Sequence, residues 1–124
     1  MMYARRIRVW LAFAILLVFC SVMVVTQMQA NLSKHVELRE AFILLESKGY
    51  HPQAKNLYQK LIKELENLPD SALLDDYDRT LSLVGGTQDD PENLIWRYHW
   101  TVSNEMDQRS HSALGKALKM AEEP

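Results

Sequence analysis

The sequence predicts an all-α protein in which one apolar helix is followed by a small bundle of about five helices. Residues 9–26 carry no charged side chain and are predominantly apolar. Residues 31–124 instead repeat apolar side chains at the spacing of amphipathic helices, and no segment alternates apolar and polar residues as a half-buried strand does. These observations divide the chain into a basic tail (1–8), an apolar segment (9–30) and a helical body (31–124).

The apolar segment has the length and composition of a membrane-spanning helix. About 20 apolar residues in an α-helix cross the roughly 30 Å hydrocarbon core of a bilayer. Arg5, Arg6 and Arg8 stand directly before the segment, and basic residues beside a membrane helix stay on the cytoplasmic side. Trp10 lies at the same end, where an indole ring suits the headgroup region. We therefore expect a single-pass anchor with a cytoplasmic amino terminus and, in a bacterium, an inner-membrane protein with a periplasmic body.

A cleaved signal peptide is the alternative interpretation, because it too begins with a basic stretch followed by an apolar one. The apolar run is longer than the roughly 7 to 15 residues of a usual signal-peptide core. The best candidate for cleavage is the bond after Ala30, but Met28 occupies a position where a small residue is normal. We expect the anchor to be retained, and cleavage stays open.

The composition of the body limits its partners. The body holds all 16 acidic residues of the chain and 11 of the 14 basic ones, so it is mildly acidic. A nucleic-acid partner would require a basic face, and we expect none. Cys20, the only cysteine, lies in the apolar segment. The body therefore has no disulfide framework, and its apolar core alone must hold it together.

Apolar stripes and helix-breaking residues define the expected helices of the body. The first two cover residues 38–48 and 52–68, and Gly49 follows the first of them as a carboxyl-terminal helix signal. A third stripe runs over residues 73–84 and ends at a Gly-Gly pair.

Two more helices are expected in the last third of the chain. Residues 90–92, Asp-Pro-Glu, predict a helix start, because an acidic cap precedes a proline at the first helical position. The last helix is expected to begin at residue 110 or 112 and to end at about residue 121, with Leu114 and Leu118 facing inward.

The first two helices of the body carry a recognisable spacing. Gly49 ends the first helix, Ala54 is a small residue early in the second, and Tyr58 follows four residues later. With these residues, the stretch over 38–69 resembles one tetratricopeptide repeat, a helix-turn-helix of about 34 residues. Leu38 and Phe42 depart from that family's pattern, which has a tryptophan and a small residue at these positions.

The resemblance implies a helical hairpin whose first helix lines a concave groove for a protein partner. Candidate groove residues are Glu40, Ile43 and Leu44, which lie on or beside the apolar stripe of the first helix. A generic helical hairpin without such a groove is the alternative.

The sequence shows no set of residues that indicates catalysis or metal binding. The four histidines are not spaced to place two ligands on one helical face, and no nucleotide-binding or nucleophile motif is present. Asp75, Asp76 and Asp78 form the densest acidic group, and the apolar stripe beside them predicts that they face solvent. We expect no enzymatic activity, no metal and no cofactor.

Aromatic residues cluster in the fourth expected helix of the body. Trp96 and Trp100 form a strip beside the main apolar face, and Arg97 lies between them in sequence. The strip either seals the core or is exposed as a docking surface, since tryptophan and arginine are enriched at binding hot spots. The candidate protein-binding residues are therefore Trp96, Trp100 and Arg97, together with the groove residues Ile43, Leu44 and Glu40.

These features predict a membrane-anchored protein-interaction module: a scaffold, an assembly factor or an accessory subunit of a membrane or envelope complex. The alternative hypothesis is a carrier of a small ligand or haem peptide. Its pocket would lie between helices and be lined by Trp96, Trp100, Tyr58 and His99.

Overall fold

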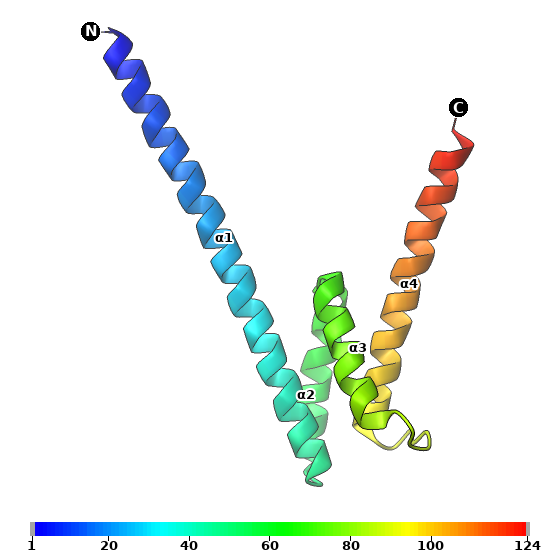
Figure 1. Ribbon diagram of the computed structural model, residues 1–124. Coiled ribbons are helices and arrows are strands. Elements are labelled where there is room, and N and C mark those ends of the chain that lie inside the picture. The colour runs from blue at the N-terminus through cyan, green and yellow to red at the C-terminus, as the bar shows by residue number, and fades with distance from the viewer. Residues whose placement is uncertain (1, 124) are drawn as a thin grey trace. The chain divides into compact units, whose positions relative to one another are not determined.

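The computed structural model describes residues 2–123, with side chains from residue 6 onward. Within this range the chain is helical and has no β-strand, as the sequence predicts (Figure 1). The elements are α1 (Met2–Ser47), α2 (His51–Glu64), the short 3₁₀ helix η1 (Leu65–Asn67), α3 (Asp70–Val84) and α4 (Leu94–Glu122).

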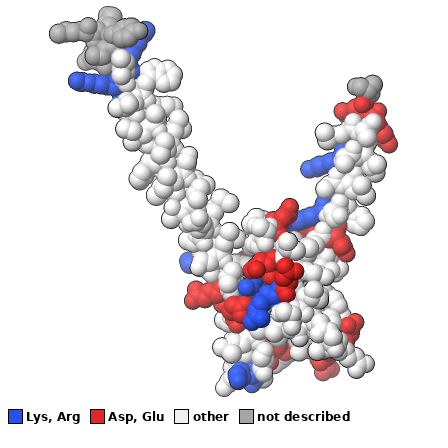
Figure 2. All heavy atoms as spheres, in the orientation of Figure 1, with Lys and Arg blue, Asp and Glu red and all other residues white. Residues whose placement is uncertain are grey.

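The chain divides into two compact units, residues 1–35 and residues 36–124. In the first unit, the described residues form the amino-terminal part of α1, and its most apolar stretch has no buried side chain. Among the described residues, one helix is long and apolar enough to cross a membrane, with a mean hydropathy of 2.7 over its most apolar stretch. Figure 2 shows this part of α1 as uncharged along most of its length, with basic side chains near its amino end.

The second unit packs the end of α1 with α2, α3 and α4 around a small apolar core. The largest fully buried apolar side chains come from all four helices and are Phe42, Leu61, Leu73, Leu94, Tyr98 and Val102. The Phe42 ring lies 6.1 Å from the Tyr58 ring and 5.8 Å from the Tyr98 ring. One aromatic residue of α1 therefore packs against both α2 and α4.

Helices α3 and α4 run antiparallel to each other. Near the start of α3, Asp70 accepts a hydrogen bond from Arg109 of α4 at 2.8 Å. Further along α3, Thr80 lies 2.8 Å from the Nδ1 atom of His99, which belongs to the first turns of α4. Arg109 also donates to the carbonyl oxygen of Leu65 at 3.0 Å, so it joins α4 to η1 as well.

The predicted start of the fourth body helix is wrong by a few residues. Residues 90–92 form a turn, and α4 begins at Leu94. The side-chain oxygen of Asn93 accepts hydrogen bonds from the backbone N–H groups of Ile95 and Trp96, at 2.9 and 3.4 Å. Asparagine is among the strongest capping residues. The hydrogen bonds at Asn93 therefore determine where the helix begins, and Pro91 does not.

The described residues of the body form four α-helical segments and the short η1, where the sequence predicts about five helices. The last two expected helices are one helix, α4, because the residues between them, 107–109, include no glycine or proline. Gly115 lies within the last expected helix, and a single glycine costs a helix only about 1 kcal/mol. The inward orientation expected for Leu114 and Leu118 is also wrong. Both are more than half exposed, since no described element covers residues 111–123.

Candidate functional site

Three ring-bearing residues of α4 gather on one helical face. Trp96, His99 and Trp100 are three and four positions apart, the spacing that places side chains together on a helix. The ring of Trp96 lies 5.6 Å from the ring of Trp100 and 6.1 Å from that of His99. Trp100 is 37% exposed, and Trp96 is half-buried against the core. The strip is therefore partly a core seal and partly surface.

Helix α3 extends this surface. The ring of Tyr77 lies 4.9 Å from that of His99, which joins the two helices. Leu74 and Leu81 share the face of α3 that carries Tyr77, and both are exposed. We call the combined surface, made by Leu74, Tyr77, Leu81, Trp96 and Trp100, the α3–α4 aromatic face.

His99 is buried and packs against residues of the α3–α4 aromatic face. Its Nδ1 atom lies 2.8 Å from the hydroxyl oxygen of Thr80, and that hydroxyl donates to the backbone carbonyl oxygen of Asp76 at 2.9 Å. Burial lowers the pKa of His99 below its ordinary value of about 6.5, because the charged imidazolium loses its hydration there. The imidazole is therefore neutral at neutral pH.

The lowered pKa of His99 predicts a loss of stability in mild acid. The unfolded chain takes up a proton at this histidine as the pH falls below about 6.5, whereas the folded chain does so only at lower pH. The stability that depends on neutral His99 is therefore complete above about pH 6.5. It is lost as the pH falls below that value. We expect His99→Gln to reduce the difference in urea midpoint between pH 7.5 and pH 5.5.

The matched control for this prediction is His111→Gln, which changes an exposed histidine in the same helix. His111→Gln should leave the difference in urea midpoint between the two pH values as it is in the unsubstituted chain. Equal pH dependence in the His99→Gln variant and the unsubstituted chain would show that His99 is not the responsible group.

A buried polar network joins α1, α3 and α4 at the centre of the body. The carboxylate of Asp76 is 0% exposed, and each of its oxygens has a partner. One accepts a hydrogen bond from Nη1 of Arg39 at 2.8 Å, and the other accepts from the hydroxyl of Tyr98 at 2.5 Å. Burial and the Asp76 carboxylate raise the pKa of Tyr98 well above its ordinary value, so its hydroxyl stays protonated and donates. The negative charge of Asp76 is thus fully compensated inside the core.

Arg39 extends this network to the surface. Burial alone would lower the pKa of Arg39, but its hydrogen bonds to Asp75 and Asp76 raise it above the ordinary value. The Arg39–Asp75 bond is 2.7 Å long. Glu40 beside it accepts two hydrogen bonds from Arg79, at 2.8 and 3.0 Å, and these hold the pKa of Glu40 below its ordinary value. Figure 2 shows acidic and basic side chains mixed together on the surface of the second unit.

The prediction that Asp75, Asp76 and Asp78 all face solvent is wrong for Asp76. Asp75 and Asp78 are exposed, but Asp76 lies on the face of α3 that also carries the buried residues Leu73 and Thr80. The missed signal was the spacing of these three residues, which are three and four positions apart, together with an arginine in the apolar stripe of α1.

The predicted docking residues are distributed over the body. Ile43 is 5% exposed and belongs to the core, whereas Leu44 is largely exposed. Glu40 accepts hydrogen bonds from Arg39 and Arg79 of the polar network. The guanidinium of Arg97 lies 5.6 Å from the centre of the Tyr58 ring, on the α2 side of α4. Of the six candidates, the structure brings Trp96 and Trp100 into contact.

Two residues of the alternative carrier pocket, Tyr58 and His99, pack against different neighbours. Tyr58 packs against Phe42, and His99 is buried with Thr80. A cavity of about 240 Å³ lies beside Trp96, lined by residues of the end of α3, the loop and the start of α4. This volume is below the range of roughly 300–1,000 Å³ that is typical of small-molecule sites.

The fold and these surfaces define the class of protein: an all-α chain with a helical body and one helix able to cross a membrane. Within residues 2–123, no group of three His, Cys, Asp or Glu side chains is placed to hold a metal ion. No family model, no curated protein and no solved structure matches the chain.

Proposed function

We propose that this chain is a single-pass membrane protein whose helical body binds another protein of the same membrane. One observation carries the proposal: the most apolar stretch of α1 has no buried side chain. Each Å² of apolar surface left in water costs about 25 cal/mol, so a run of exposed Ile, Leu, Val and Phe side chains favours an apolar environment over water. A lipid bilayer supplies one.

The charge distribution supports an orientation with the amino terminus in the cytoplasm. Arg5, Arg6 and Arg8 precede the apolar run, and the first acidic residue of the chain is Glu37. Basic residues close to a membrane helix are retained on the cytoplasmic side. In a bacterium the body then lies in the periplasm.

The α3–α4 aromatic face is the proposed docking surface. Tryptophan and tyrosine are enriched at binding hot spots, because they bury a large area with little loss of conformational entropy. Acidic side chains lie close to this face in sequence, at Asp78 on α3 and at Asp89 and Asp90 in the loop before α4. The partner we propose is therefore a protein surface that combines apolar and basic side chains. A scaffold, an assembly factor and an accessory subunit all fit this description.

The hairpin formed by the end of α1 and α2 offers a second surface. Gly49 adopts a φ of 87° at the turn, and Ala54 is completely buried. These features support the tetratricopeptide-like interpretation, in which a glycine ends the first helix and a small residue allows the second to approach. On this hairpin, Leu44 is the exposed apolar side chain of the proposed groove.

A photo-cross-linking amino acid at position 100 or 44 tests which surface the partner uses. We expect a discrete cross-linked product from position 100 in intact cells. The Trp100→Ala substitution should weaken recovery of the same partner about 30-fold, which corresponds to the roughly 2 kcal/mol of a hot-spot residue. Truncation of a hot-spot side chain removes packing that water cannot replace.

Met120→Ala is the matched control, because Met120 is an exposed apolar residue of the same helix outside the α3–α4 aromatic face. It should leave partner recovery unchanged. If Trp100→Ala and Met120→Ala recover the partner equally well, the α3–α4 aromatic face is not the docking surface.

A further inference from the structure

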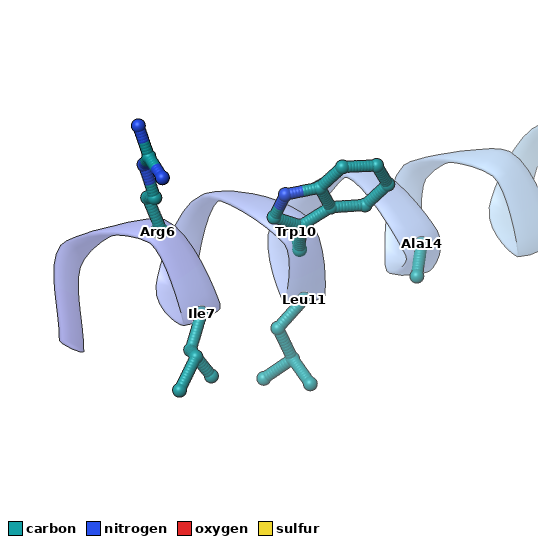
Figure 3. A pocket seen from close by; sticks show the side chains of 5 residues that line it. All are labelled: Arg6, Ile7, Trp10, Leu11 and Ala14. Atoms are coloured by element: carbon teal, nitrogen blue, oxygen red, sulfur yellow. The ribbon is translucent and has the colours of Figure 1, made fainter. Parts of the chain in front are cut away.

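The amino end of α1 carries a groove that combines polar and apolar side chains. It has a volume of about 540 Å³ and is lined by Arg6, Ile7, Trp10, Leu11 and Ala14. In Figure 3 the guanidinium of Arg6 and the indole of Trp10 lie on one side of the helix, and Ile7 and Leu11 point to the other. The indole nitrogen is on the edge of the ring nearer Arg6.

The donors and charges at this groove favour an anion. The planar guanidinium of Arg6 matches the geometry of phosphate oxygens, and the indole N–H of Trp10 can only donate. In the sequence, Arg5 and Arg8 lie within two residues of Arg6, and no acidic residue occurs before Glu37. Beside these donors, Ile7 and Leu11 are more than half exposed and offer an apolar surface. A fitting ligand joins a phosphate to an apolar chain.

We propose that this groove binds an anionic phospholipid of the cytoplasmic leaflet. Its phosphate lies at Arg6 and Trp10, and one acyl chain follows Ile7 and Leu11 toward Ala14. The inference rests on the proposed membrane anchor, which places the start of the apolar run at the depth of the headgroups. Each basic residue near the surface of an anionic leaflet raises the affinity for that leaflet roughly fivefold. A guanidinium that is held in place beside a phosphate also forms hydrogen bonds with it.

Quenching of Trp10 fluorescence by brominated lipids tests the site in the full-length chain. Trp96→Phe and Trp100→Phe leave Trp10 as the only tryptophan. The chain is reconstituted in phosphatidylcholine vesicles that contain brominated phosphatidylglycerol or, at the same mole fraction, brominated phosphatidylcholine. We expect stronger quenching by brominated phosphatidylglycerol, with a preference of about fivefold or more.

Arg6→Gln and Arg8→Gln form a matched pair, because each removes one positive charge but only Arg6 lines the groove. Arg6→Gln should lower the preference for phosphatidylglycerol about threefold more than Arg8→Gln does, since it also removes the hydrogen bonds to the phosphate. Arg6→Lys should restore part of the preference, because lysine keeps the charge but not the planar fork.

Equal effects of Arg6→Gln and Arg8→Gln would overturn the site and leave only a general surface charge. Equal quenching by the two brominated lipids would overturn the site while the anchor stands. Quenching by neither lipid would contradict the membrane anchor itself, and the lipid site with it.

Discussion

Replacing Asp76 with alanine is expected to lower the free energy of unfolding of the helical body by about 3 kcal/mol. The substitution removes a carboxylate that is completely buried and that pairs with Arg39 and Tyr98. Loss of one member of a buried ion pair typically costs about 3–5 kcal/mol, because the remaining charge stays buried without compensation. We expect the lower end of this range, since Arg39 keeps its hydrogen bonds to Asp75 and Glu40.

The measurement is urea or thermal unfolding of the full-length chain in detergent, followed by the fluorescence of Trp96 and Trp100. For a domain of this size, 3 kcal/mol corresponds to a fall in melting temperature of roughly 12–24 °C. Asp78→Ala is the matched control, because Asp78 is an exposed acid of the same helix. It should change the stability by less than about 0.5 kcal/mol. Similar unfolding of the two variants would contradict the structural role of Asp76.

Asp76 also shows where reasoning from the sequence reaches its limit. Three aspartates close together on an amphipathic helix normally face solvent. The burial of one of them depends on Arg39, which is 37 residues away in sequence, and on Tyr98, which is 22 residues away. No local pattern reports that an arginine on one helix and a tyrosine on another will meet the same carboxylate. Such long-range pairing becomes visible only in the folded chain.

Helix type was predictable, whereas helix ends were less so. Apolar periodicity identified the helices because it reflects the face that each buries. The apolar segment and the expected helix over 38–48 are parts of one helix, α1, since no glycine or proline lies between residues 27 and 37. At α4, the Asn93 cap decided the start rather than the more conspicuous Asp-Pro-Glu sequence.

The aromatic strip was predicted in part. The contact between Trp96 and Trp100 follows from their spacing of four residues on a helix. The contribution of Leu74, Tyr77 and Leu81 did not follow from the sequence, because it depends on the antiparallel packing of α3 against α4. Arg97, although adjacent to Trp96 in sequence, lies over Tyr58 of α2. A helix separates neighbouring residues onto different faces.

The paired substitution Leu17→Arg and Val18→Arg is expected to prevent membrane insertion. Both residues lie in the middle of the uncharged run and are more than half exposed. An arginine at the centre of a membrane helix raises the free energy of insertion by roughly 2.5–3.5 kcal/mol, so two arginines raise it by roughly 5–7 kcal/mol. The favourable insertion free energies of the leucine and the valine are lost as well. Leu114→Arg with Leu118→Arg makes similar changes on the exposed part of α4 and should leave insertion unchanged.

Alkaline carbonate extraction of cell membranes, followed by intact-mass measurement, tests the anchor most directly. The account predicts that the unsubstituted chain stays in the membrane pellet with residues 9–30 still attached, and that the Leu17→Arg, Val18→Arg variant is released to the supernatant. A mature chain that begins at Asn31 and is found in the soluble fraction would contradict the anchor.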